Sequence, residues 1–349
     1  MHSGPQMRMA GFALLTAVNC VALVCFAQAQ GAARTGNVVA GLDQRIGGAA
    51  VSASQRQQAL TLATALRDIL ERDPAIATPA GYSLRIHRAF GKRSDWANFD
   101  SGLPFYAGAY ATFFEAQVKP SPTSFSEPDF GIYVNTVLQC PMMEFTPPGS
   151  AQPWSVAEDQ PVVQGGRRTG EIHGFDLYDG QCAIAGRSKE PPFLPLTRQQ
   201  FVTLQIGVMK DRLKNVPSTQ NADPAVRDAI ESATRQINEA IANMQQDLAR
   251  MSAAERQAPA TVRTGNARAD LADISDPEAI PLSVPNPAFF DHSLPGSTIQ
   301  SVAVFLPFLQ PGERAAGLPS GLPDEWRPIA EKIRDGLDWE ALKRLLQTQ

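Results

Sequence analysis

The spacing of the apolar residues changes from a helical to a strand-like period near residue 80, and this change most narrows the folds open to the chain. Over residues 54–72 the apolar side chains recur every three or four positions, at Ala59, Leu62, Leu66, Ile69 and Leu70. Over residues 82–185 apolar and polar side chains alternate, which is typical of β-strands with one buried face. The sequence therefore predicts an α+β fold, with an antiparallel sheet of about four to six strands packed against helices.

Local signals set the expected ends of these elements. Ser54 and Gln57 predict an N-terminal capping box for the helix over 54–72, and Asp73-Pro74 predicts its end. Strands are expected over 82–90, 105–118 and 131–140, which are rich in aromatic and β-branched residues. The pair Asp179-Gly180 predicts a tight turn, so that residues 171–185 form a hairpin.

Two further helices follow. Thr197 and Gln200 predict a capping box for a helix over 198–215, which we expect to cover the sheet together with the helix over 54–72. Asp223-Pro224 predicts the start of a helix over 224–250. This helix has a seven-residue apolar repeat, at Ile230, Ile237, Met244 and Met251. The repeat favours antiparallel packing on another helix, and a self-associating coiled coil is the alternative.

These features divide the chain into five parts. The predicted parts are a signal peptide (1–29), a flexible leader (30–50), an α+β core (51–216), a helical arm (217–265) and a Pro-rich C-terminal segment (266–349). We expect the last part to contain a strand near 299–306 and a terminal helix capped by Asp338.

The N-terminus predicts export. A basic residue, Arg8, precedes an apolar run that continues to Phe26, and Ala27-Gln28-Ala29 matches the small-residue pattern at which signal peptides are cleaved. We therefore expect a periplasmic or extracellular protein whose mature chain does not span a membrane. An uncleaved anchor is the alternative, because the run is close to the length that spans a bilayer.

The charge balance argues against nucleic acid as a partner. The full sequence has a formal net charge of −4, and residues 1–29 hold one Arg and no acidic residue. The mature chain is therefore slightly more acidic, whereas proteins that bind nucleic acid usually present a basic face.

Two of the four cysteines, Cys140 and Cys182, lie outside the predicted signal peptide. In an oxidising compartment an isolated pair of this kind predicts one disulfide bond. A reactive thiol or a metal thiolate is the alternative, but a sulfur in a disulfide can be neither nucleophile nor ligand.

The sequence offers no recognisable catalytic or metal-binding motif. The stretch EIHGFDLYDGQC (171–182) combines Glu, His, Asp and Cys, but the turn signal explains it better as part of a hairpin. Common zinc, calcium, phosphate-loop and serine-elbow patterns are missing from the sequence, so no cofactor and no catalytic residue is assigned. His173 and His292, each with nearby carboxylates, are the residues that a hydrolase would have available.

A cluster of basic residues offers one candidate binding surface. Arg85, His87, Arg88, Lys92 and Arg93 follow one another closely. In a strand such residues usually form a solvated outer face, and the functional alternative is docking to an anionic envelope or glycan surface. Taken together, the sequence favours an exported non-catalytic protein with a binding or structural role, and the alternative is a secreted hydrolase that uses His173 or His292.

Overall fold

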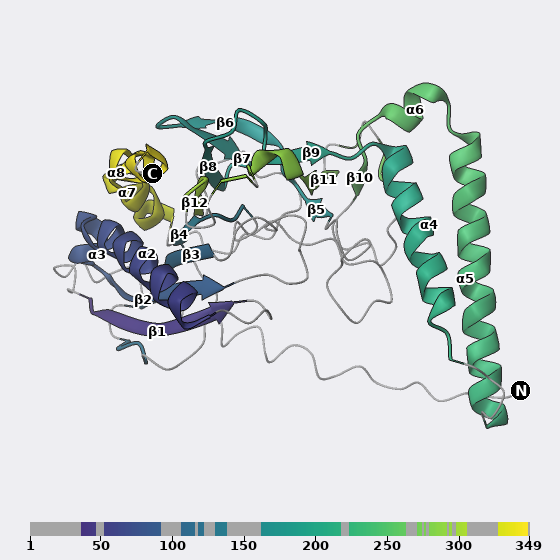
Figure 1. Ribbon diagram of the computed structural model, residues 1–349, viewed down its shortest axis with the longest axis horizontal. Coiled ribbons are helices and arrows are strands. Elements are labelled where there is room, and N and C mark those ends of the chain that lie inside the picture. Colours follow the sequence, from purple (N-terminus) through teal and green to yellow (C-terminus); the bar gives the residue numbers. More distant parts are fainter. Residues whose placement is uncertain are drawn as a thin grey trace, which may run out of the picture.

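An eight-stranded sheet forms the body of the protein in the computed structural model (Figure 1). The structure describes residues 36–46, 52–91, 106–115, 118–121, 130–137, 162–217, 223–262, 271–273, 276, 279–291, 293–294, 298–305 and 327–347. In spatial order the strands are β1 (Val38–Ile46), β2 (Tyr82–Gly91), β3 (Tyr106–Glu115), β4 (Phe130–Val134), β12 (Ser301–Phe305), β8 (Cys182–Gly186), β7 (Phe175–Tyr178) and β6 (Arg168–Ile172).

The predicted α+β class is confirmed, but the sheet has more strands than the four to six expected. One reason lies in the C-terminal segment. Its strand β12 lies in the middle of the sheet, between β4 and β8 and antiparallel to both. A strand from the last third of the chain therefore joins the two halves of the sheet.

The edge strand β1 was not expected. Residues 30–50 were predicted to be a flexible leader, but Val38–Ile46 pair with β2 in parallel register. The register shifts between Ala40 and Asp43, where Gly41 and Leu42 form an irregularity. Pairing of the backbone with β2, rather than burial of large apolar side chains, holds this segment in the sheet, and this explains why its composition gave no strand signal.

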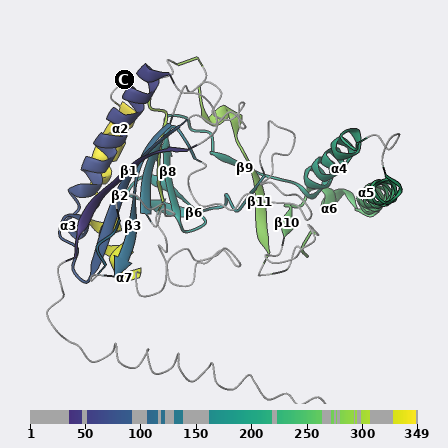
Figure 2. The same ribbon diagram turned by 90° about the horizontal axis from the view of Figure 1, so that it is seen from below.

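Helices cover one face of the sheet. They are α2 (Ala53–Glu71), α3 (Pro74–Ala77), α7 (Arg327–Gly336) and α8 (Trp339–Gln347). Alternate residues of the strands, such as Leu84 and Ile86 of β2, point into the apolar core beneath these helices. Figure 2 shows α2 and the C-terminal helices on the same side of the sheet. The start of α2 lies two residues before the predicted one, since Ser52 and Gln55 form the capping box.

A smaller sheet and a pair of helices lie beyond the end of the body that is opposite α2 (Figure 1). The small sheet consists of β10 (Thr261–Val262), β11 (Ile280–Pro285) and β5 (Val163–Gln164), and β9 (Phe193–Pro195) also pairs with β11. The helices are α4 (Arg198–Lys214) and α5 (Pro224–Arg250), followed by the short α6 (Ala253–Gln257).

The expectation that residues 198–215 cover the large sheet is wrong. The predicted caps of α4 and α5 are confirmed, at Thr197 and Asp223. However, α4 packs against α5 and the small sheet, and α7 and α8 take the expected place on the large sheet. In both views α4 and α5, called the helix pair below, lie at the end of the molecule opposite α2 (Figures 1 and 2).

Candidate functional site

The helix pair carries a candidate site in the described part of the chain. Ile237, Met244 and Met251, three members of the predicted seven-residue repeat, pack in one cluster with Val202 and Ile206 of α4. This confirms antiparallel packing on another helix, because α4 and α5 run in opposite directions (Figure 1). The apolar side of α5 is therefore occupied by α4, and its polar side faces outward.

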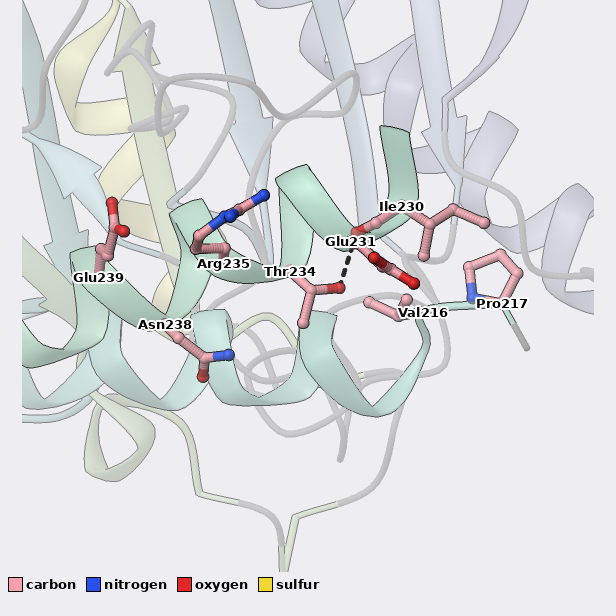
Figure 3. Close-up of a pocket in the computed structure, with 8 residues that line it drawn as sticks. All are labelled: Val216, Pro217, Ile230, Glu231, Thr234, Arg235, Asn238 and Glu239. Carbon is pink, nitrogen blue, oxygen red and sulfur yellow. Dashed lines mark hydrogen bonds between the residues drawn. The ribbon is translucent and has the colours of Figure 1, made fainter. Parts of the chain in front are cut away.

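An open groove of about 740 Å³ lies where the end of α4 meets the N-terminal half of α5 (Figure 3). Its lining residues are Val216, Pro217, Ile230, Glu231, Thr234, Arg235, Asn238 and Glu239. Five of these are polar or charged and lie on one side of α5, at positions three or four residues apart. Sites for small ligands are mostly apolar and enclosed, so this open and charged groove suits contact with another protein better.

The charged side chains of the groove are not bound to one another. In Figure 3 the Thr234 hydroxyl donates a hydrogen bond of 2.8 Å to the carbonyl of Ile230, whereas no interaction joins Arg235 to Glu231 or Glu239. All three charged residues are exposed. A carboxylate, a guanidinium and a second carboxylate therefore point away from the helix without neutralising one another.

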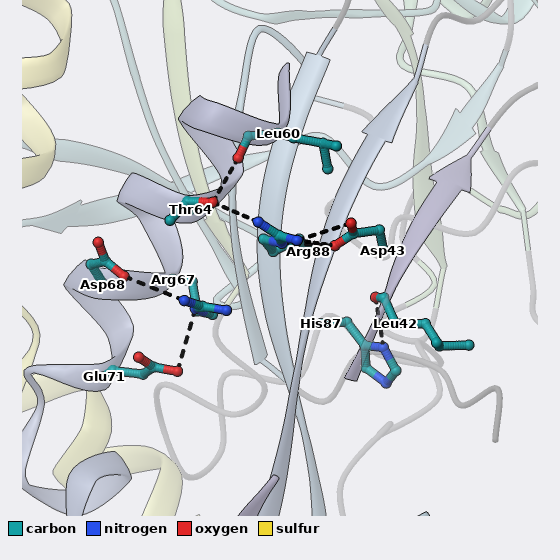
Figure 4. Close-up of polar contacts among 9 residues, drawn as sticks. All are labelled: Leu42, Asp43, Leu60, Thr64, Arg67, Asp68, Glu71, His87 and Arg88. Atoms are coloured by element: carbon teal, nitrogen blue, oxygen red, sulfur yellow. Dashed lines mark hydrogen bonds and ion pairs between the residues drawn. The ribbon is translucent and has the colours of Figure 1, made fainter. Parts of the chain in front are cut away.

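Two of the three described residues of the predicted basic surface are buried. Arg85 and His87 have exposed fractions of 0%, so they cannot touch an external surface. Arg88 is engaged within the fold, since it forms an ion pair of 2.7 Å with Asp43 and donates a hydrogen bond of 2.7 Å to Thr64 (Figure 4). Lys92 and Arg93 lie outside the described residues. Both faces of the sheet are buried here, whereas a single buried face was expected.

His87 has a packing role instead. Its ring stacks on Tyr110 with the centroids 4.9 Å apart, and its Nδ1 atom lies 3.2 Å from the carbonyl oxygen of Leu42 (Figure 4). A Cβ atom on Gly41 would come within 2.3 Å of the ring, so the glycine makes room for it. Burial lowers the pKa of His87, so its imidazole is neutral at physiological pH and adds no positive charge.

His173, one of the two candidate hydrolase residues, lies in an exposed turn. The turn of His173 and Gly174 joins β6 to β7, and both residues have positive φ. The imidazole stacks on Trp339 with the centroids 5.2 Å apart. The pKa of the nearby Asp335 is lowered mainly by a hydrogen bond from Arg334, with His173 as a minor contributor. His292 lies outside the described residues, so its position relative to His173 is not described.

The stretch EIHGFDLYDGQC forms two turns rather than one. The predicted turn at Asp179-Gly180 is confirmed between β7 and β8, and the turn at His173-Gly174 adds the strand β6. The expected hairpin over 171–185 is therefore part of a three-stranded meander. Among the residues that the structure describes, no group of three or more His, Cys, Asp and Glu is arranged to hold a metal ion.

The predicted disulfide involves one described cysteine. Cys182 has an exposed fraction of 1% and lies in a buried cluster that includes Val137. Cys140 lies outside the described residues, so the bridge stays a prediction. Three residues of extended chain span about 10 Å, and Cys140 follows Val137 by that number of residues. The position of Val137 is therefore within chain reach of the predicted pairing.

Asp179 holds the turn between β7 and β8 against a neighbouring loop. Its carboxylate accepts hydrogen bonds from the backbone N–H groups of Gly166 and Arg167, at 2.6 and 3.2 Å. A Cβ atom on Gly165 would lie 2.4 Å from this carboxylate, and the φ of Gly165 is +101°. Glycine is required there for both reasons. Burial raises the pKa of Asp179 to about 6, although the two backbone hydrogen bonds act in the opposite direction.

Replacing Asp179 by Asn should flatten part of the dependence of stability on pH. Since the folded-state pKa is above that of an unfolded Asp, the folded protein binds more protons between about pH 4 and pH 6. The free energy of unfolding therefore contains a contribution that is present below pH 4 and is lost as the pH rises through 6. Relative to Asp179→Asn, the wild-type protein should lose about 2–3 kcal/mol between pH 4 and pH 7.5. Urea unfolding of both proteins at several pH values measures this, and parallel curves would contradict the role given to Asp179.

The residues of the groove were visible in the sequence but were not singled out. Glu231, Arg235 and Glu239 alternate in sign at a spacing of four residues. That spacing places them on one side of a helix, but only the position of α4 shows that this side faces outward.

Comparison with known proteins adds no family to these observations. No protein-family model matches the chain, and no curated protein and no solved structure matches it either.

Proposed function

We propose that the protein is exported and has a non-catalytic binding role, with the helix pair as its contact surface. The observation that carries the proposal is the exposure of α5. This helix has 27 residues, and Ile241 is the one residue along it that is buried in the described structure. A long helix that packs through one side only and projects from the body of a protein is suited to contact with a partner.

The body of the protein supports this role as a scaffold. The large sheet and its helices form a well-packed core, and the described histidines there, His87 and His173, contribute aromatic stacking. Among the described helices, none has both the length and the hydrophobicity that crossing a membrane requires. We therefore place the binding chemistry on the exposed helix pair.

The chemistry of the groove favours a protein partner. An anionic envelope or glycan surface would be recognised by a concentration of positive charge. The groove instead presents Glu231 and Glu239 beside Arg235, so its complement carries both signs of charge. In the exported protein such a partner is a protein of the envelope or of the medium outside the cell.

The alternative, a hydrolase that uses His173 or His292, has weaker support. A general base must lie within hydrogen-bond reach of the group that it deprotonates. The contact that fixes the His173 ring is stacking on Trp339, which suits a packing role.

Photo-crosslinking within the native compartment tests the proposed contact surface. A photoreactive amino acid in place of Asn238, which lines the groove, should give a crosslinked adduct upon illumination. The matched control is the same amino acid in place of Lys332, which is exposed on α7 on the body of the protein. We expect adducts from position 238 at several times the yield from position 332. Equal yields, or adducts from position 332 alone, would overturn the proposed role of the helix pair.

A further inference from the structure

The outward side of α5 carries four charges that alternate in sign. They are Arg227, Glu231, Arg235 and Glu239, each four residues from the next, and we call them the charge stripe. All four are exposed. Residues four apart form a continuous ridge on the surface of a helix, so the charges follow one line and do not scatter around α5.

The charge stripe does not lie on the side of α5 that packs on α4. The helix α4 contacts α5 through the opposite, apolar side, where Ile237, Met244 and Leu248 pack. In the described part of the chain, no other helix or strand lies on the outer side of α5 (Figures 1 and 2). Three members of the stripe also line the groove described above.

An alternating row with an even number of charges is complementary to itself when it is reversed. If a second α5 lies antiparallel to the first with the two-fold axis at residue 233, Glu231 faces Arg235 of the second copy. In the same arrangement Arg227 faces Glu239. Both contacts occur twice by symmetry, so all the charges of the stripe meet an opposite charge.

We propose that the occupant of the charge stripe is a second copy of this chain, docked antiparallel on α5. This deepens the proposed function, on which it rests, because it names the partner for the same surface. The stripe spans 13 residues, from Arg227 to Glu239, and therefore about 18 Å of helix between its first and last members. Ridges of this kind from two helices lie alongside each other when the axes cross at about −50°, which is the commonest packing between helices.

Stabilisation of α5 itself is a simpler role for these charges than docking of a second copy, and the two roles must be distinguished. Opposite charges four residues apart can stabilise the helix that carries them. In this structure Arg235 forms no ion pair with Glu231 or Glu239 (Figure 3). The central charges of the stripe are therefore not paired with one another within α5. A contact of this length is smaller than a standard interface, so we expect weak association that depends on salt.

Mixing two charge-reversal variants tests the proposal. In Glu231→Arg the pair 231–235 becomes positive on both sides of the axis, and in Arg235→Glu it becomes negative on both sides. Each purified variant alone should therefore dissociate, with a dissociation constant at least about tenfold above that of the wild type. In an equimolar mixture, residues 231 and 235 of one variant meet opposite charges on the other, so a heterodimer should form. Sedimentation velocity of each variant and of the mixture measures this at low ionic strength.

Two further samples complete the experiment. The control Arg250→Glu makes the same change in net charge as Arg235→Glu, but beyond the end of the stripe, and should dimerise like the wild type. The exchange variant Glu231→Arg/Arg235→Glu should dimerise with itself. Circular dichroism of each single variant verifies that α5 has formed, and association in the mixture is itself a sign of intact α5 surfaces.

Several outcomes would overturn the proposal. They are a wild-type chain that stays monomeric at up to about 1 mM, single variants that dimerise as well as the wild type, and a mixture that sediments as the sum of its parts. The proposed binding role is tested separately. A monomeric chain that still gives adducts with another protein from position 238 would retain that role and exclude self-association.

Discussion

A Trp339→Ala variant should lose about 3–5 kcal/mol in the free energy of unfolding, which is the usual cost of removing a buried Trp. The indole has an exposed fraction of 4% and lies in the main core under α8. Its ring contacts Phe175 edge-on at 5.1 Å, and its Nε1–H donates a hydrogen bond of 2.9 Å to the carbonyl of Arg334. One side chain therefore joins the sheet, α8 and the end of α7.

Two matched variants separate the effect of losing the buried indole from that of any substitution at the start of α8. Trp339→Phe retains an aromatic ring against Phe175 and loses the hydrogen bond, so its loss should be intermediate. Glu340→Ala changes the next residue, which is exposed, and should stay within about 0.5 kcal/mol of the wild type. Urea unfolding followed by far-ultraviolet circular dichroism gives all three values. A loss below about 1 kcal/mol for Trp339→Ala would contradict the packing of α8 on the sheet.

Removing the predicted bridge between Cys140 and Cys182 should have an effect of similar size. A crosslink that closes a loop of about 40 residues restricts the unfolded chain enough to stabilise the protein by about 4 kcal/mol. Cys182→Ala, Cys140→Ala and reduction of the wild-type protein should each cost about this amount. The double variant should cost little more than either single variant, because the bridge is lost as soon as one partner is removed.

Additivity is the outcome that would contradict the bridge. If the two cysteines are independent, the losses of the single variants should be small and should add in the double variant. The alanine variants leave a small cavity at the buried Cys182 site, so the unreduced and reduced wild-type proteins are the cleanest comparison.

Local signals in the sequence predicted several helix ends correctly and failed at one. Thr197 and Asp223 were identified as caps because each has a single set of capping partners nearby. The start of α2 was placed two residues late because Ser52 and Ser54 each have a Gln three residues further on. The sequence thus offered two equivalent capping boxes, and the protein uses the first one.

The alternation of the strands predicted which residues share a face, but not what covers each face. Arg85 and His87 lie on the face opposite Leu84 and Ile86, as the alternation predicts, yet they are buried and not solvated. Tyr110 of the neighbouring strand lies on the same face as His87 and is also buried. The burial of the face that carries Arg85 and His87 depends on segments that are distant in the sequence. A local sequence pattern does not predict such contacts.

The candidate site depended on tertiary structure for a similar reason. The apolar repeat of α5 predicted one side that would be packed, and the charges on the remaining side were visible. Whether that side would face a sheet or solvent depended on where α4 lies. Since α4 pairs with α5 and not with the large sheet, the charge stripe is exposed.

The central claim is that this is an exported protein whose remaining cysteines are bridged and whose role is binding through an exposed surface. Mass spectrometric peptide mapping of the protein from its native compartment, without reduction, tests the basis of this claim most directly. We predict an N-terminus at Gln30 and one linked peptide pair that contains Cys140 and Cys182. A chain that still begins at Met1, with both cysteines present as free thiols, would contradict it.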